Sequence, residues 1–97
     1  GELETAAMLH VAPHLVEPDR NAWGDGRTNP STLEGVRNGV AWMPRRWTQA
    51  TNDTGVGNPR AASAESGAAF MAQAVDRIAA FCCELAMADP QRLWTQP

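Results

Sequence analysis

The sequence predicts part of an α/β protein in which helices and short strands are joined by long loops. Three observations predict this class: a helical apolar pattern at the start of the chain, a run of strand-forming residues before Pro44, and a long amphipathic helix in the last third. These elements are too few to enclose a core in a chain of 97 residues. We therefore expect a portion of a larger α/β body, or one half of a nicked one.

The first expected element is a short helix over residues 2–12, with a loose final turn to Val16. Its apolar residues recur at helical spacing: Leu3, Ala6, Ala7, Met8 and Val11. Pro13 ends it, because proline lacks a backbone N–H and disfavours helical geometry in the residue before it. Glu2 and Glu4 occupy the first turn, where an acidic side chain facing the helix dipole contributes about 0.3 to 1 kcal/mol.

The middle of the chain is expected to be mostly loop. Residues 17–39 are rich in Gly, Pro, Asn and Asp and contain at most a helical turn near residues 32–36. Residues 39–43, Gly-Val-Ala-Trp-Met, favour a short strand, so the chain holds one or two short strands. Residues 52–60 form a turn-rich connection to the last helix.

The last element is a long amphipathic helix that begins after Ser63, a plausible N-cap, and is stopped by Pro90. Its apolar stripe consists of Gly67, Phe70, Met71, Ala74, Val75, Ile78, Phe81, Cys82 and Leu85. Burying the four largest of these side chains would contribute roughly 6 to 12 kcal/mol before entropy is counted. The first helix and one strand barely provide a surface for that burial, so the stripe predicts further polypeptide as its partner.

Charge and composition exclude some functions. The chain has 8 basic residues, all arginine, against 11 acidic residues, for a net charge of −3. Binding to nucleic acid requires a basic patch, and Arg45-Arg46 is too small to be one. No window approaches 18 consecutive apolar residues and no leader is visible, so we expect neither a membrane-spanning nor a secreted protein.

The cysteines favour a reducing compartment. Cys82 and Cys83 are adjacent within a helical pattern, where their side chains point about 100° apart. They suit neither a structural disulfide nor a CxxC site, so we expect a cytoplasmic protein.

Three ordered stretches resemble the C-terminal segment of the creatininase (creatinine amidohydrolase) family. "GELETAAML" resembles the motif His-Ala-Gly-Glu-x-Glu-Thr-Ser-x-Met-Leu from its third position, and "TGVGNPRAASAESG" resembles Thr-Gly-Val-x-Gly-Asp-Pro-x-x-Ala-Thr-Ala-Glu-Lys-Gly. The long amphipathic helix follows at the expected place. The departures from these motifs are Ala6 for Ser, Asn58 for Asp, Ser63 for Thr and Ser66 for Lys. They weaken any transfer of substrate identity.

The resemblance implies a three-layer α/β/α fold, of which residues 1–97 are the C-terminal portion of a single domain that does not fold alone. The expected partners are the N-terminal remainder of the same protein, in the same chain or as a nicked partner chain, and further copies in a homo-oligomer, a hexamer by resemblance. Family members are metal-dependent amidohydrolases. The resemblance therefore implies a divalent metal, with zinc first and manganese or iron as alternatives.

Carried over by position, Glu2 would ligate the metal and Glu4 would orient a ligand or the catalytic histidine. The motif's His and Ala would directly precede Gly1. Residues two apart on a helix point about 200° apart, so both acids cannot reach one metal if both are helical. We therefore expect Glu2 to lie on a non-helical approach to the helix. The alternative is that Glu2 only complements the helix dipole.

Other candidates have weaker support. His10 and His14 are expected to be surface or interface residues, because Pro13 interrupts the helix between them. Trp42, Arg46 and Trp47 lie in a segment that family members place near the active-site mouth, so they could form a flat apolar wall for a small cyclic amide. Packing in a subunit interface or in an ordinary core is the alternative for these residues. Trp23 and Trp94 are assigned to packing.

The function implied by the resemblance is hydrolysis of a C–N bond in a small amide, cyclic amides included, by a metal-activated water. Two alternatives stay open. One is a formamide or short-peptide hydrolase of the same family, and the other is a non-catalytic fragment that serves assembly or binding.

Overall fold

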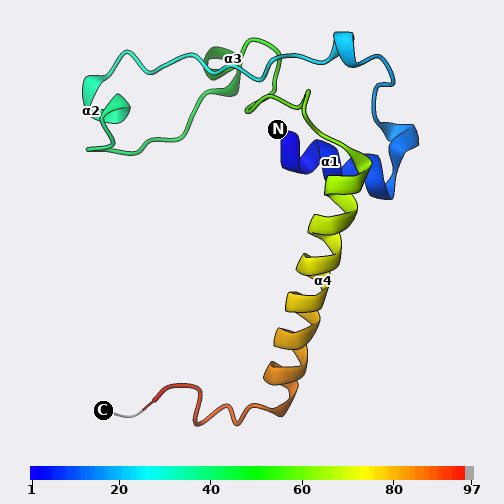
Figure 1. Cartoon of the computed structure of the whole chain (residues 1–97). Helices are drawn as coiled ribbons and strands as arrows, with labels where there is room; N and C mark the ends of the chain where they lie inside the picture. Colours follow the sequence, from blue (N-terminus) through cyan, green and yellow to red (C-terminus); the bar gives the residue numbers. More distant parts are fainter. Residues whose placement is uncertain (96–97) are drawn as a thin grey trace.

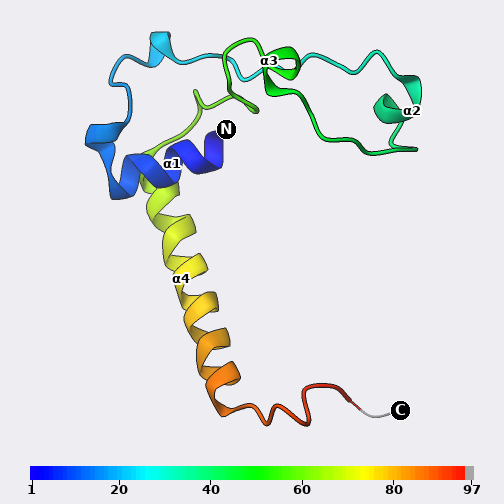
Figure 2. The same cartoon turned by 180° about the vertical axis from the view of Figure 1, so that it is seen from behind.

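A computed structural model describes residues 1–95 of the chain. Its elements are α1 (Glu2–Val11), η1 (Pro13–Leu15), η2 (Arg20–Ala22), α2 (Glu34–Arg37), α3 (Trp47–Ala50) and α4 (Ala64–Met87). Figures 1 and 2 show α4 running away from α1 and from the loops around the start of the chain. The molecule is flat, with extents of 49 × 40 × 17 Å.

The two long helices, α1 and α4, lie where the sequence predicted them. α1 ends at Val11, and Pro13 opens η1 immediately after it. α4 begins after Ser63, whose hydroxyl accepts a hydrogen bond from the backbone N–H of Ser66 at 3.1 Å. This N-cap satisfies one of the unpaired N–H groups of the first turn, as the sequence predicted.

α1 packs across the N-terminal end of α4, where buried Ala6 faces buried Gly67. A β-carbon on Gly67 would overlap the main-chain carbonyl of Ala6. The absence of that carbon lets the two helix backbones approach each other closely. This contact fixes the start of α1 relative to α4.

A small core lies around the indole of Trp23. Trp23 and Ala62 are buried, and Arg20 donates to the carbonyl of Ala62 at 2.9 Å. The indole N–H of Trp23 donates to the carbonyl of Glu17 at 2.8 Å, and the guanidinium of Arg20 lies 4.9 Å from its ring centre. Arg60 donates to the carbonyl of Trp23 at 3.2 Å. The packing role predicted for Trp23 is confirmed.

Residues 29–50 form an arm that extends away from the helices, with α2 near its tip (Figure 1). Its base is closed by an isolated bridge between Thr28 and Thr51 and by a hydrogen bond of 2.8 Å from the N–H of Asn29 to the carbonyl of Ala50. The helical turn expected near residues 32–36 is present as α2.

The strand expected at residues 39–43 is wrong. Residues 41–46 have no regular secondary structure, and none of residues 1–95 belongs to a named strand. A strand requires backbone hydrogen bonds to a neighbouring strand. Within residues 1–95 this segment has no such neighbour, so its β-forming composition alone does not produce one. The sheet layer of the predicted α/β/α fold is therefore not seen in this part of the chain.

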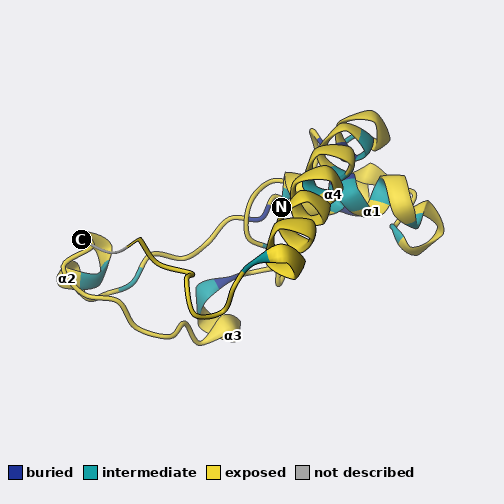
Figure 3. Cartoon of the chain, turned by 90° about the horizontal axis from the view of Figure 1, so that it is seen from below, coloured by how far each residue is buried: buried dark blue, intermediate teal, exposed yellow. Residues whose placement is uncertain are grey.

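Most of the apolar stripe of α4 is uncovered beyond its contact with α1. Phe70, Val75, Ile78, Phe81 and Leu85 have between 42% and 62% of their surface exposed. Figure 3 shows α4 almost entirely in the colour of exposed residues beyond its contact with α1. The predicted lack of a partner surface for this stripe holds for residues 1–95. No helix in this part of the chain combines the length and apolar character needed to cross a membrane.

Candidate functional site

The acidic start of α1 is the first part of the candidate site. α1 begins at Glu2, so Glu2 and Glu4 are both helical, and the expectation that Glu2 precedes the helix is wrong. The first turn of α1 is closed directly after Gly1, because the N–H and the hydroxyl of Thr5 both donate to the carbonyl of Gly1, at 3.1 and 2.8 Å. Residues two apart on a helix diverge, so the two carboxylates do not converge on one point.

Glu4 is exposed in the first turn of α1. A hydrogen bond with its own backbone N–H lowers the pKa of Glu4. Glu4 is therefore ionised and can orient a positively charged or N–H-bearing neighbour. Glu2 is exposed to solvent at the same end of α1.

Within residues 1–95, no group of three or more His, Cys, Asp and Glu side chains lies together as a metal-binding cluster. The described residues therefore supply at most part of a metal site, to which Glu2 could offer one carboxylate oxygen. Zinc, manganese and iron all accept such an oxygen. The other ligands would have to come from polypeptide outside these residues.

The two histidines do not join this end of the chain. His10 lies in the last turn of α1 and His14 lies in η1, and both are exposed. The predicted surface position of both residues is confirmed. Cys82 and Cys83 are likewise exposed on α4, as free cysteines.

A glycine-rich cluster of backbone, formed by Gly26, Val56 and Gly57, packs against the start of α1. The N–H of Gly57 donates to the carbonyl of Gly26 at 2.9 Å, and both glycines have positive φ, +85° and +64°. A β-carbon on Gly26 would overlap the backbone of Gly57. A β-carbon on Gly1 would lie 3.0 Å from the carbonyl oxygen of Val56. The second motif thus packs directly on the first.

Asp53 links the parts of this glycine-rich cluster by hydrogen bonds, and the sequence analysis missed it. One carboxylate oxygen accepts from the N–H of Gly55 at 3.0 Å, and the other accepts from the N–H of Gly26 at 3.4 Å. The spacing Asp53-x-Gly55 is typical of an Asx-turn, so its local bond could have been predicted. The bond to Gly26 joins residues 27 apart and leaves no pattern in the sequence.

The expected substrate-wall residues lie on the arm or at its base, and the structure does not gather them into one surface. Trp47 begins α3, its indole N–H donates to the carbonyl of Thr54 at 2.9 Å, and the guanidinium of Arg45 lies 5.3 Å from its ring centre. Trp42 lies on the unstructured link between α2 and α3 and is 84% exposed. Arg46 lines a separate concavity.

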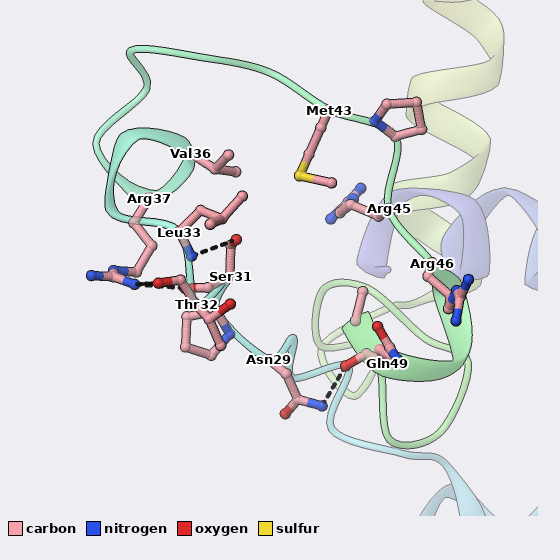
Figure 4. A pocket seen from close by; sticks show the side chains of 13 residues that line it. Asn29, Ser31, Thr32, Leu33, Val36, Arg37, Met43, Arg45, Arg46 and Gln49 are labelled. Carbon is pink, nitrogen blue, oxygen red and sulfur yellow. Dashed lines mark hydrogen bonds between the residues drawn. The ribbon is translucent and has the colours of Figure 1, made fainter.

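That concavity lies between the two sides of the arm and has a volume of about 910 Å³ (Figure 4). Leu33, Val36 and Met43 give it an apolar floor, and Arg45 and Arg46 lie at its edge. Arg37 is occupied elsewhere, since it donates to the carbonyls of Ser31 and Thr32 at 2.8 Å each. Trp42 and Trp47 are not among the lining residues, so of the three predicted residues only Arg46 contributes to this pocket.

Comparison with known proteins first gives the class of protein. Residues 1–82 match the model of a family described as creatinine amidohydrolase, which is a class of hydrolases. Since this match includes both motifs and most of α4, the chain belongs to the creatininase family. The resemblance identified from the sequence is thereby confirmed.

A solved structure agrees with this assignment. The chain is 39% identical to a protein from Bacteroides fragilis NCTC 9343, provisionally assigned as a creatinine amidohydrolase. The TM-score is 0.84 over 98% of this chain, so residues 1–95 have the fold of the corresponding segment of that protein. The chain spans 36% of the length of that protein. None of the curated proteins matches the chain.

Proposed function

We propose that the complete protein is an amidohydrolase that cleaves a C–N bond in a small amide, cyclic amides included. The observation that carries this proposal is the family match over residues 1–82, which spans the acidic start of α1 and the glycine-rich cluster packed against it. The related protein from Bacteroides fragilis supports the same class of reaction.

The proposal includes a place for this chain within the whole. It forms the C-terminal portion of one three-layer α/β/α domain, and the rest of that domain covers the apolar stripe of α4. Large exposed apolar residues along α4 support this arrangement, because soluble monomers rarely leave a contiguous apolar face of this kind uncovered. The sheet layer then belongs to polypeptide outside residues 1–95.

In this arrangement Glu2 supplies one carboxylate ligand to a divalent metal, zinc first and manganese or iron as alternatives. Such an ion would lower the pKa of a coordinated water towards about 7 and would polarise an amide carbonyl. Glu4 holds a neighbouring ligand or histidine in orientation through its ionised carboxylate. Glu2 is exposed at the end of α1, so its carboxylate is open to a partner from the rest of the protein.

The test measures bound metal and creatinine turnover on the complete protein, comparing Glu2→Gln with the wild type. Loss of a direct ligand is expected to remove most of the bound zinc and of the activity. Glu65→Gln is the matched control, because Glu65 is also an exposed acid in the first turn of a helix. Unchanged zinc content and turnover in Glu2→Gln would remove Glu2 from the mechanism.

Substrate class is tested with the same protein. Creatinine, a formamide and a short peptide are supplied in parallel, and turnover of creatinine alone supports a cyclic amide. Preference for the formamide or the peptide would move the protein to another activity of the family. Absence of turnover on all three, with no bound metal, would favour an assembly or binding role.

A further inference from the structure

Asp53 joins segments of the chain that are far apart in sequence. Its carboxylate accepts the N–H of Gly55 within its own turn and the N–H of Gly26 from the segment that follows η2. The two N–H groups face different oxygens of this carboxylate. An asparagine in the same position would place its NH2 donors against one of these N–H groups and leave that N–H unsatisfied, so the junction fits a carboxylate better than an amide.

The segments that Asp53 joins have almost no room to adjust. A β-carbon on Gly24 would overlap the Asp53 carboxylate, and one on Gly26 would overlap the backbone of Gly57. Thr54, next to Asp53, has a positive φ of 67°, which is uncommon for a residue with a side chain. Gly26 and Gly57 pack backbone on backbone, so no flexible side chain lies between these two residues to absorb a displacement.

Both parts of the candidate site are attached to this junction. On one side, the carbonyl of Val56 and the α-carbon of Gly57 lie against Gly1, the residue before Glu2. On the other side, the indole N–H of Trp47 donates to the carbonyl of Thr54, which directly follows Asp53. Residues 53–57 therefore connect the start of α1, which holds Glu2, to Trp47 by direct contacts.

We infer that Asp53 is a positioning residue that sets where the start of α1, with Glu2, lies relative to Trp47. This inference rests on the proposed hydrolase function for its effect on turnover, and on the structure alone for its effect on the backbone. Asp53 itself touches neither a metal nor a substrate in this account. It acts through Gly1 and Thr54.

The experiment compares Asp53→Asn with the wild type in the complete protein, by two independent readouts. The first is amide hydrogen exchange of residues 24–27, 54–57 and the first turn of α1, where faster exchange is expected in the variant. The second is kcat/KM for creatinine together with the affinity for zinc alone. Losses of roughly 10- to 100-fold in either quantity are expected, the size typical of residues that orient a metal ligand.

Asp89→Asn is the matched control. Asp89 is exposed and its carboxylate accepts the N–H of Gln91 at 2.9 Å, the same local spacing as Asp53 and Gly55, but within residues 1–95 this carboxylate bonds to no distant segment. This control is expected to leave exchange near α1 and turnover unchanged. Asp53→Glu, which keeps two acceptor oxygens, is expected to recover part of the lost kcat/KM.

Trp47→Phe separates positioning from simple stability, because it removes the indole N–H and with it the bond to Thr54. If Asp53 acts through this junction, the losses in kcat/KM of the two single variants will not multiply in the double variant. Exchange near α1 that matches the Asp89→Asn control would overturn the inference. Altered exchange in a protein whose wild type cleaves neither creatinine nor the formamide nor the short peptide would uphold the junction and count against the hydrolase function instead.

Discussion

Gly67 of α4 lies against the main-chain carbonyl of Ala6 in α1 so closely that a β-carbon on Gly67 would overlap the carbonyl oxygen. We expect Gly67→Ala to lower the free energy of unfolding by about 1 to 3 kcal/mol, the usual cost of overpacking. Alanine favours a helix over glycine by about 1 kcal/mol, but a backbone atom cannot rotate out of the way. Urea unfolding of the complete protein measures the change.

The control for this prediction is Gly35→Ala in α2. Gly35 is also helical, but the nearest heavy atom to its β-carbon position is 4.0 Å away, at Val40. The free energy of unfolding is expected to stay the same or rise slightly. Equal destabilisation by both substitutions would mean that the close approach of α1 and α4 at Gly67 is not the cause of the loss in stability.

The start of α4 gives a second prediction. Ser63→Ala removes the hydroxyl that accepts the N–H of Ser66, so we expect a loss of about 1 kcal/mol in the free energy of unfolding. Ser66→Ala is the control. The Ser66 hydroxyl donates to the carbonyl of Ser63 and shares a hydrogen bond of 2.8 Å with the Ser63 hydroxyl, but its removal leaves the N-cap bond from the Ser66 N–H in place. Thermal unfolding of both variants should place Ser63→Ala clearly below Ser66→Ala.

The elements that could be predicted from the sequence are those fixed by local chemistry. α1 stops before Pro13 because of proline's own geometry, and α4 starts at Ser63 because a serine hydroxyl can cap a helix N-terminus. The exposed stripe of α4 was also predictable, since its apolar residues exceed what the rest of the chain can cover. The two helix boundaries need only residues a few positions apart, and the exposed stripe needs only the apolar pattern of α4 and the composition of the chain.

The remaining features depend on contacts between distant residues. Strand-forming residues at 39–43 have no neighbouring strand within residues 1–95, so their composition is no guide to their conformation. The role of Asp53 depends on Gly26, which lies 27 residues away. Nothing in the turn at residues 53–57 marks that partner, although the Asx spacing marks the turn itself.

The uncovered stripe of α4 gives a third prediction: replacing one of its apolar residues should benefit the isolated chain, by raising its solubility, but should destabilise the complete protein. Phe81 is 59% exposed on this stripe. In the isolated chain of residues 1–97, Phe81→Glu should raise solubility, because it removes apolar surface that promotes association. In the complete protein the same residue is proposed to be buried, so truncation to Phe81→Ala should cost about 3 to 5 kcal/mol.

Gln73→Glu on the opposite face of α4 is the control for both contexts. Gln73 is exposed and belongs to the polar side of the helix, so its substitution should change neither solubility nor unfolding appreciably. Sedimentation of the isolated chain and chemical unfolding of the complete protein are the measurements. A complete protein unaffected by Phe81→Ala would show that the rest of the domain does not cover this stripe.

The last prediction concerns Trp42, which makes the arm's link between α2 and α3 unusually apolar for a surface segment. Its side chain is 84% exposed, so nothing in residues 1–95 requires it for packing. If it forms part of a substrate wall, Trp42→Ala should raise KM for creatinine about ten-fold or more, since a buried aromatic contact is worth at least about 1.4 kcal/mol. Trp94→Ala is the matched control, because Trp94 is 88% exposed and has no proposed contact with substrate. Steady-state kinetics of the complete protein that change equally in both variants would remove Trp42 from the wall, whereas a change in oligomer size without a change in KM would place it in a subunit interface.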